Sequence, residues 1–404
     1  MNMVKKSTLF TLLFVALSFA IVACENEKPH ETPNPDNDIE QPVPGPLTES
    51  HTLMIIMQGN NGLAEFMDSN LQRIITAYYD VPTDVGRILI FYDRGNYTRL
   101  TELYMDDGMA KQRLIEEYPT STSTVDKEFL AGVINRMKDV APADSYGLIM
   151  SSHGGGWVPA DLYDVYLLGE SSRANEPNAK PLFYGQDDSD CMEIPDLVDA
   201  LKHTRFKYII FDACMMANVE SLYDMRNMAD YIIASPTEIL GAGFPYENFL
   251  PLLFERTDHK LKEVCEEYME YYRDTSGTIA LIDCRKMDAL AEAMRGVYAE
   301  AKSVDVSQVQ AYDNFPYHLY FDLGDYVKQV ATGDTLERFN AALMDVVIYS
   351  GYTNTFFTVT GEDDAYIPIE EYSGLSCYIL QEDDCPNTAA AWRDTAWAKA
   401  VGAE

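Results

Sequence analysis

Basic residues are scarce in this 404-residue sequence, which contains 30 Lys and Arg against 65 Asp and Glu and carries a formal net charge of −35. A surface this acidic repels phosphate backbones, and no basic stripe interrupts it, so the composition disfavours nucleic-acid binding. The negative potential of such a surface attracts basic polypeptides or divalent cations, although strong acidity is more often a solubility feature.

Several enzyme signatures are missing as well. The sequence contains no Gly-rich loop that would cradle a phosphate, no zinc motif and no Gly-x-Ser-x-Gly elbow. Cysteine is also sparse: apart from Cys24, the chain carries Cys191, Cys214, Cys265, Cys284, Cys377 and Cys385. These are too few to be the framework of a fold of about 350 residues, although export permits disulfides. For Cys377 and Cys385, a disulfide and two free thiols are both open.

Residues 1–23 are predicted to be an export signal. Lys5 and Lys6 precede an apolar run over residues 9–23, which is short for a membrane span and has the charged start and small-residue end of a cleaved leader. Residues 21–24 (Ile-Val-Ala-Cys) resemble a bacterial lipobox, in which Cys24 becomes the lipid-carrying N-terminus. An ordinary secretory leader and a retained span are the alternatives. We therefore expect an exported protein that is lipid-anchored to the bacterial cell envelope, with the outer-membrane surface as one destination.

A proline-rich stretch follows the leader. Residues 24–50 carry six prolines among Asn, Asp and Glu and hardly any large apolar residues. They cannot build a core and are expected to form a disordered tether. The remaining chain has the composition of a globular protein, and we expect one large domain at residues 51–320 with a C-terminal α+β lobe at residues 321–404 packed on it.

Apolar runs alternate with helical periodicity beyond the tether, a pattern typical of an α/β fold with a mostly parallel sheet between helices. Strands are predicted at Leu53–Met57, Arg87–Tyr92, Leu100–Met105, Gly147–Ser151, Tyr208–Asp212, Tyr231–Ala234 and Thr278–Asp283. Helices are predicted at Leu63–Tyr79, Asp126–Val140, Ile194–Lys202, Met216–Met228, Lys260–Arg273 and Met287–Lys302. In the C-terminal lobe, helices are predicted at Leu323–Val330 and Leu336–Tyr349 and strands at Thr353–Thr360 and Leu375–Leu380.

Two predicted strands end in reactive side chains. The strand that ends at Ser151 leads through Ser152 to His153 and then to Gly-Gly-Gly-Trp at residues 154–157. The strand that ends at Asp212 leads through Ala213 to Cys214. The carboxyl ends of neighbouring parallel strands meet at one edge of a sheet, where ligands bind. If these two strands are neighbours, His153 and Cys214 face one cleft.

This arrangement suits thiol catalysis. A thiol attacks as the thiolate, which a nearby imidazole and a helix N-terminus both favour, and a helix is predicted to start just after Cys214. The glycines after His153 allow close approach of the backbone to a substrate, and the N–H groups of Gly154 and Cys214 are the predicted donors of an oxyanion hole. A buried Cys and a loop His are the ordinary alternatives for each residue alone. The joint placement favours a catalytic pair.

The same residues resemble a known family. The strand ending in His153-Gly154, the strand ending in Asp-Ala-Cys at residues 212–214, and the segments 231–238 (Tyr-Ile-Ile-Ala-Ser-Pro-Thr-Glu) and 241–246 (Gly-Ala-Gly-Phe-Pro-Tyr) resemble the clostripain family. The resemblance is strong over residues 53–246, and the C-terminal lobe fits in length. It implies a caspase-like α/β/α sandwich and a cysteine peptidase, here in a bacterial lipoprotein form.

The resemblance also implies residue roles. It makes Cys214 the nucleophile that forms a thioester and His153 the general acid–base, which work as a dyad. It places Asp212 at the base of the S1 pocket, where a carboxylate pairs with a P1 Arg or Lys, and Glu238 would add a second acid. The alternative for Asp212 is a cap on the helix that follows Cys214. Protein or peptide substrates with basic P1 residues are therefore implied.

Two further properties of the family concern processing and calcium. Members often mature by cutting themselves between the two strands, and Arg173 and Lys180 are the candidate cleavage points here; an uncut surface loop is the alternative. No cofactor is expected to be required, and no metal site is assigned. Calcium stimulation is known in the family, and residues 187–190 or 362–364 would supply oxygen ligands. Neither has the spacing of an EF-hand, which favours ordinary solvated acidic clusters.

Two functions compete with an Arg/Lys-directed exported endopeptidase. One is a surface-displayed binding lipoprotein that keeps the fold without turnover; intact His153 and Cys214 argue against it. The other is a hydrolase or acyltransferase that uses the same dyad on a non-peptide acyl compound, and only a substrate profile separates it from the endopeptidase. The expected partners are peptide substrates and, through the N-terminal lipid, a membrane; nucleic acid is not expected.

Overall fold

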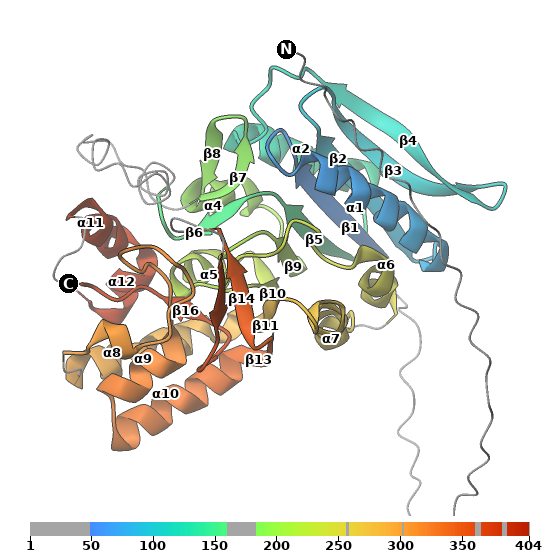
Figure 1. Ribbon diagram of the computed structural model, residues 1–404. Coiled ribbons are helices and arrows are strands. Elements are labelled where there is room, and N and C mark those ends of the chain that lie inside the picture. Colours follow the sequence, from blue (N-terminus) through green and yellow to red (C-terminus); the bar gives the residue numbers. More distant parts are fainter. Residues whose placement is uncertain are drawn as a thin grey trace, which may run out of the picture. The chain divides into compact units, whose positions relative to one another are not determined.

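A nine-stranded sheet forms the centre of the computed structural model (Figure 1). Its strand order is β13 (Val347–Tyr352), β11 (Thr278–Asp283), β10 (Ala229–Ala234), β9 (Phe206–Asp212), β5 (Ser145–Ser151), β1 (His51–Gln58), β2 (Gly86–Asp93), β3 (Thr98–Asp106) and β4 (Met109–Tyr118). The five strands from β10 to β2 are parallel, as predicted for the centre of the sheet. Antiparallel strands extend both edges, so the whole sheet is mixed rather than mostly parallel.

The structure describes residues 49–159, 183–255, 258–300, 303–359, 365–381 and 386–403. The predicted leader and nearly all of the predicted tether lie outside these ranges, and so do Cys24, Arg173 and Lys180. Within the described ranges, no helix has both the length and the apolar character needed to cross a bilayer.

The central strands of the sheet are buried on both sides because helices cover both of its faces. Along β1, Leu53, Ile55 and Met57 pack in one apolar cluster, whereas Met54 and Ile56 pack in the other. The first cluster includes α1 (Ala64–Ala77), α6 (Tyr246–Phe249) and α7 (Leu261–Tyr272). The second includes α2 (Lys127–Val140), α4 (Ile194–Leu201), α5 (Val219–Met225), α8 (Met287–Glu300) and α12 (Ala396–Val401). The predicted α/β/α sandwich is confirmed.

The chain after residue 320 continues this same unit. Helices α9 (Leu323–Val330) and α10 (Gly333–Val346) lie beside α8 (Figure 1). The predicted helix to Tyr349 ends early, because β13 begins at Val347 and pairs with β11 in the main sheet. Further pieces are the two-stranded pairs β12 (Phe321–Asp322) with β16 (Ser376–Cys377) and β14 (Thr355–Thr358) with β15 (Ala365–Pro368), and helix α11 (Pro386–Asp394).

A small three-stranded sheet, which the sequence did not predict, lies beyond the end of β5. It comprises β6 (Gly154–Gly156), β7 (Phe183–Asp187) and β8 (Asp190–Glu193). The backbone N–H of Gly185 donates to the carbonyl oxygen of His153 at 2.9 Å, and the N–H of Gln186 donates to the hydroxyl of Ser152 at 3.0 Å. These bonds fix the chain on both sides of His153.

Candidate active site

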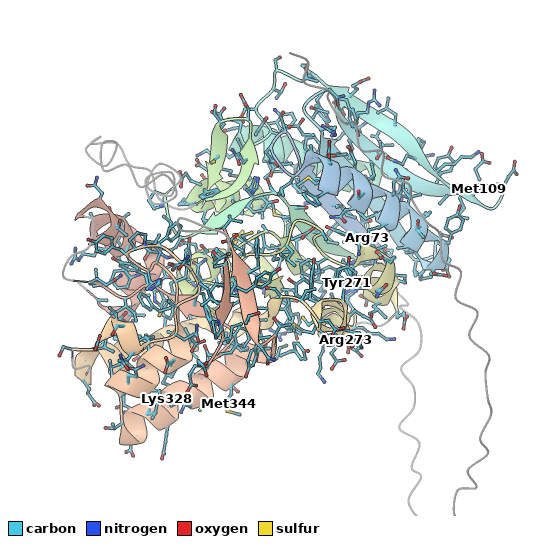
Figure 2. The ribbon with its side chains drawn as sticks, viewed as in Figure 1. Arg73, Met109, Tyr271, Arg273, Lys328 and Met344 are labelled. Atoms are coloured by element: carbon cyan, nitrogen blue, oxygen red, sulfur yellow. The ribbon has the colours of Figure 1, made fainter. Side chains whose placement is uncertain are left out.

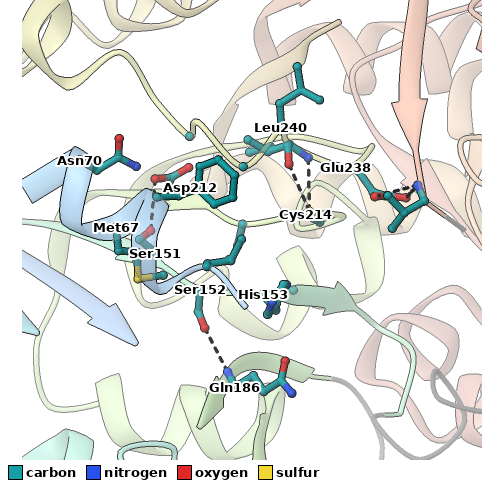
Figure 3. Close-up of a pocket in the computed structure, with 18 of the residues that line it drawn as sticks. Met67, Asn70, Ser151, Ser152, His153, Gln186, Asp212, Cys214, Glu238 and Leu240 are labelled. Carbon is teal, nitrogen blue, oxygen red and sulfur yellow. Dashed lines mark hydrogen bonds between the residues drawn. The ribbon is translucent and has the colours of Figure 1, made fainter. Parts of the chain in front are cut away.

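His153 and Cys214 leave the sheet side by side. Strands β5 and β9 are neighbours, and their last paired residues are Ser151 and Asp212. His153 and Cys214 each follow two residues later, and both line one cavity of about 710 Å³ (Figure 3). The predicted adjacency of the two strands is confirmed, and with it the shared cleft.

The chain does not enter a helix directly after Cys214. Met215 adopts a left-handed conformation with φ of 59°, and α5 begins only at Val219. Two backbone hydrogen bonds hold the intervening segment, since the N–H of Met215 donates to Thr237 and the N–H of Ala217 donates to Ser235, both at 3.0 Å. The predicted helix start at Met216 is therefore wrong, and no helix N-terminus adjoins the thiol.

Asn218 is the cap of this helix. Its side-chain oxygen accepts from the N–H of Ser221 at 2.8 Å, and its amide donates to the carbonyl oxygen of Met215 at 2.7 Å. The alternative role considered for Asp212, as the cap of the helix after Cys214, is thereby excluded.

The Cys214 thiol is protonated in this conformation. Burial, followed by the negative charge of Glu238, raises the pKa of Cys214 to about 12, against a smaller opposing effect of the hydrogen bond from Ile239. The sulfur accepts from the N–H of Ile239 at 3.3 Å and donates to its carbonyl oxygen at 3.7 Å. The expectation that the surroundings favour the thiolate is not met here, because the helix N-terminus is missing and the nearby charge is negative.

His153 is a neutral base in the same cavity. Burial lowers the pKa of His153, because the charged imidazolium loses solvent. A Cβ atom built on Gly62 would lie 3.9 Å from its Nε2, so the α1 side of the cleft comes close to the ring. A neutral imidazole and a protonated thiol on the wall of one cavity have the protonation states from which the imidazole can accept the thiol proton.

The glycines after His153 pack against the turn that carries Cys214. A Cβ atom on Gly154 would lie 2.5 Å from the carbonyl oxygen of Cys214, and one on Gly156 would lie 2.5 Å from the carbonyl oxygen of Met215. Contacts this short leave no room for a side chain. The glycines thus let the backbone of β6 approach the nucleophile turn.

Gly154→Ala is expected to lower kcat/KM for a reaction that uses Cys214 by about 100-fold, since displacing a reacting group by an ångström has an effect of that order. The matched control is Gly132→Ala on α2, where an added Cβ meets nothing within 4 Å. That variant should keep full activity and gain about 0.5–1 kcal/mol of stability. Steady-state kinetics and urea unfolding measure both, and full activity of Gly154→Ala would show that this contact does not position the turn.

Asp212 lines the cavity and is buried. Its Oδ2 accepts from the hydroxyl of Tyr246 at 2.8 Å and from that of Ser151 at 3.2 Å. A Cβ atom on Gly243, which has φ of 66°, would lie 2.7 Å from the same oxygen, so only glycine lets the loop backbone pack against the carboxylate there. Burial raises the pKa of Asp212, and hydrogen bonds from Tyr246 and Ser151 and the charge of Arg73 oppose that rise.

Arg73 on α1 fixes the loop that covers Asp212. Its guanidinium donates to Glu247 at the start of α6 and to the carbonyl oxygen of Ala242 at 3.1 Å. It also lies 5.3 Å from the ring centre of Tyr271 on α7 (Figure 2). The loop from residue 239 to residue 245 is therefore anchored at one end of the cleft.

Glu238 lines the cavity too, but its carboxylate is engaged. Both of its oxygens accept from the N–H of Val359, at 3.0 and 3.2 Å, and one also accepts from the hydroxyl of Thr358. The cavity thus brings together all of the predicted residues that the structure describes: His153, Gly154, Asp212, Cys214 and Glu238.

Other parts of the wall were not predicted. Phe66 on α1, Phe357 and Val359 from the C-terminal chain, and Gln186 near the end of β7 also line the cavity. Phe66 and Val359 are 49% and 48% exposed. No local pattern distinguishes them in the sequence, because long-range packing brings them to the cleft.

The acidic cluster at residues 187–190 is partly structural. One oxygen of Asp187 accepts from the amide of Asn60 at 2.7 Å, and the other accepts from the N–H of Thr124 at 2.7 Å. Among the described residues, no group of three or more His, Cys, Asp or Glu side chains is arranged to hold a metal ion. The other candidate cluster, residues 362–364, lies outside the described residues.

Comparisons with known proteins agree on one family. A model of the clostripain family matches residues 55–394. Clostripain of Hathewaya histolytica is 24% identical over 222 residues, covering 48% of this chain and 40% of that protein, so the chain matches less than half the length of this relative. An inactive zymogen C11 protease from Parabacteroides distasonis is 31% identical, with a TM-score of 0.77, over 88% of this chain and 99% of that one. A secreted C11 cysteine protease from Bacteroides thetaiotaomicron, in complex with an irreversible peptide inhibitor, is 28% identical, with a TM-score of 0.77, over 87% and 98%.

Proposed function

Because the chain belongs to the clostripain family of cysteine peptidases, we propose that it hydrolyses peptide bonds through a dyad of Cys214 and His153. The observation that carries this proposal is the placement of both side chains two residues beyond the Ser151–Asp212 pair, on the wall of one cavity. Cys191 on β8 also lines this cavity, but Cys214, unlike Cys191, follows the strand next to the one that leads to His153.

The proposed reaction has two steps. The sulfur of Cys214 attacks the scissile carbonyl carbon while its proton passes to His153, and the amine leaves with that proton, which forms a thioester. Water then attacks the thioester, gives a proton to His153, and releases the acid and the thiol. Backbone N–H groups of Gly154 and Cys214 are the proposed donors to the oxyanion.

A basic P1 side chain is the proposed determinant of specificity. Asp212 is a buried residue of the cavity wall, and its Oδ2 takes both side-chain hydrogen bonds. A guanidinium or ammonium group entering the cavity would find a carboxylate that little solvent screens. The half-exposed Phe66 and Val359 on the rim suit flanking peptide side chains better than a small acyl compound.

The test is a substrate profile of the purified protein. Fluorogenic peptides that differ only at P1 are expected to show kcat/KM at least about 100-fold higher for Arg and Lys than for Leu or Asp, a ratio typical of a buried ion pair that forms or fails to form. Equal rates at all four would contradict the proposed S1 acid. Cleavage of a thioester or small ester without any peptide cleavage would favour the non-peptide hydrolase.

Asp212→Asn is expected to lower kcat/KM for Arg and Lys peptides by about 100-fold and to change that for a Leu peptide far less. The amide keeps an acceptor for Tyr246 but removes the counter-charge. In the wild type, burial raises the pKa of Asp212, so its charge is present at high pH and is lost as the pH falls through that raised value. Selectivity for basic P1 should therefore decline towards acid pH in the wild type and be flat in the variant, which a pH series of kcat/KM measures.

Export and anchoring are proposed from the sequence alone. The leader at residues 1–23 and Cys24 in a lipobox-like setting support a lipid-anchored protein of the cell envelope, tethered by residues 24–50. Mass spectrometry of the N-terminal peptide in the membrane fraction tests this, because lipidated Cys24 has a characteristic mass. The same spectra would report cleavage after Arg173 or Lys180, the proposed self-cleavage points, and activity assays with calcium or a chelator would report any stimulation by calcium.

A further inference from the structure

The segment Thr237-Glu238-Ile239 contacts the nucleophile turn through its two outer residues. The carbonyl oxygen of Thr237 accepts from the N–H of Met215 at 3.0 Å. The N–H of Ile239 donates to the sulfur of Cys214 at 3.3 Å, and its carbonyl oxygen faces the same sulfur at 3.7 Å. The position of Cys214 therefore depends on where this segment lies.

The middle residue of the segment points the other way, to the C-terminal chain. The Glu238 carboxylate accepts from the Thr358 hydroxyl and from the N–H of Val359, about 120 residues further along. Glu238 is 9% exposed and Thr358 is fully buried, so solvent does little to weaken these bonds. Figure 3 shows the dashed contacts of Glu238 on one side and those of Cys214 on the other.

The hairpin that supplies Thr358 is itself held in place. Strands β14 and β15 pair with each other, and the N–H of Phe357 donates to the hydroxyl of Ser276 at 2.6 Å. Phe357 and Val359 form part of the cavity wall. A displacement of this hairpin would therefore displace Glu238. Because the next residue, Ile239, is hydrogen-bonded to the sulfur of Cys214, it would displace that sulfur as well.

We propose that Glu238 is a positioning residue, which couples the β14–β15 hairpin to Cys214, and not a second acid for the substrate. This inference rests on the proposed peptidase function for its kinetic consequences. The carboxylate has two separable effects. Its hydrogen bonds anchor the hairpin to the nucleophile loop, and its negative charge raises the pKa of the nearby thiol.

Two substitutions separate the anchor from the charge. Thr358→Val is nearly isosteric, removes one hydrogen bond to Glu238 and leaves its charge in place. Glu238→Gln keeps an acceptor for Thr358 and Val359 and removes the charge. Thr101→Val is the matched control, because Thr101 also carries a hydrogen-bonded hydroxyl in the sheet, on β3, and does not line the cavity.

The experiment uses the purified full chain and two measurements. The first is kcat and KM for Arg, Lys and Leu peptides. The second is the rate at which iodoacetamide alkylates Cys214 between pH 7 and 12, followed by mass spectrometry of the peptide that contains Cys214. Melting curves confirm that each variant is folded.

Thr358→Val is expected to lower kcat about tenfold, the equivalent of one buried hydrogen bond, with KM and the preference for basic P1 within about threefold of the wild type. Its alkylation rate at fixed pH should change, but the pH midpoint of alkylation should not. Glu238→Gln is expected to move that midpoint to lower pH while it also preserves the preference for basic P1. Thr101→Val should resemble the wild type in every measurement.

A different pattern would overturn the proposal. If Glu238→Gln raises KM for Arg and Lys peptides about tenfold or abolishes the preference for them, while Thr358→Val is unaffected, Glu238 binds substrate instead. If the wild type cleaves no peptide, the proposed function fails, but alkylation still tests the coupling. In that case an alkylation rate in Thr358→Val equal to that in Thr101→Val would show that the hairpin and Cys214 are not coupled.

Discussion

Cys214→Ala is expected to reduce kcat/KM for Arg and Lys peptides by roughly 10⁴-fold or more, because the covalent route through the thioester is lost. His153→Ala is expected to have an effect of similar size. In this structure the thiol is protonated, with a pKa of about 12, and needs a base to take its proton. The measurement is steady-state hydrolysis of a basic fluorogenic peptide, with circular dichroism to confirm folding.

The double variant is the sharper test of a dyad. Two residues that act as one unit do not have additive effects, so Cys214→Ala combined with His153→Ala should be no slower than either single variant. Additive losses would mean that the two side chains act in separate steps. Activity that survives Cys214→Ala would remove the thioester mechanism. Cys265→Ala is the matched control, since Cys265 is a buried core thiol on α7 outside the cavity, and its loss should affect stability and not the chemistry.

The pH dependence of the wild type follows from the same groups. Burial lowers the pKa of His153 below its ordinary value of 6.5, and only the neutral imidazole can accept the thiol proton. The base is therefore present above that lowered value and is lost as the pH falls through it. For a Leu peptide, where Asp212 plays no part, the acid limb of kcat/KM should lie below pH 6.5.

The adjacency of His153 and Cys214 could be predicted because its information is local. Strands β5 and β9 are apolar runs that are buried on both faces, and each is followed within two residues by a reactive side chain. Two such runs are expected to be neighbours in a parallel sheet, and the Ser151–Asp212 pairing bears this out. The role of the Gly-Gly-Gly run could also be predicted from the sequence, since glycine permits close backbone approach.

The conformation around the thiol could not be predicted, because it depends on distant partners. Met216 and Ala217 fit a helical pattern, yet the N–H groups of Met215 and Ala217 donate to residues 237 and 235 instead of starting a helix. The hydrogen bond from Thr358 to the Glu238 carboxylate depends on a hairpin more than 100 residues away. Edge strand β4 was not predicted, because much of it is exposed and its buried and exposed residues do not alternate regularly.

Another buried acid, Glu220, has no signal in the sequence, because a glutamate in the first turn of a helix is usually exposed. It is fully buried at the start of α5. One oxygen accepts from the N–H of Tyr378 at 3.0 Å and from the indole N–H of Trp392 at 2.9 Å, and the other has no hydrogen-bond partner among the described residues. Glu220 thus joins α5 to the C-terminal chain, and burial raises its pKa to about 8.

This raised pKa predicts how stability changes with pH. In the unfolded chain the carboxyl ionises near its ordinary 4.5, whereas in the folded protein it stays protonated up to about 8. Between these values the folded state binds the extra proton, so Glu220 destabilises the fold progressively as the pH rises through this window. The total is roughly 5 kcal/mol, at about 1.4 kcal/mol for each factor of ten in the proton equilibrium.

Glu220→Gln is expected to remove this dependence. It keeps an acceptor for Tyr378 and Trp392 but cannot ionise. The difference in unfolding free energy, wild type minus variant, should fall by roughly 5 kcal/mol between pH 4.5 and pH 9, while other titrating groups cancel in the difference. Urea unfolding at a series of pH values measures it. A difference that is flat over this range would mean that the carboxyl ionises equally easily in both states.

Glu220→Ala separates the hydrogen bonds from the charge. It removes the acceptor altogether and leaves the N–H of Tyr378 and the indole N–H of Trp392 buried without a partner, each of which costs about 1–3 kcal/mol. It should therefore destabilise the protein at pH 5, where Glu220→Gln resembles the wild type. At pH 9 the loss of the ionised carboxylate offsets part of that penalty, so the alanine variant should move closer to the wild type as the pH rises. Equal destabilisation by alanine at both pH values would contradict the assigned shift, even if the hydrogen bonds are as described.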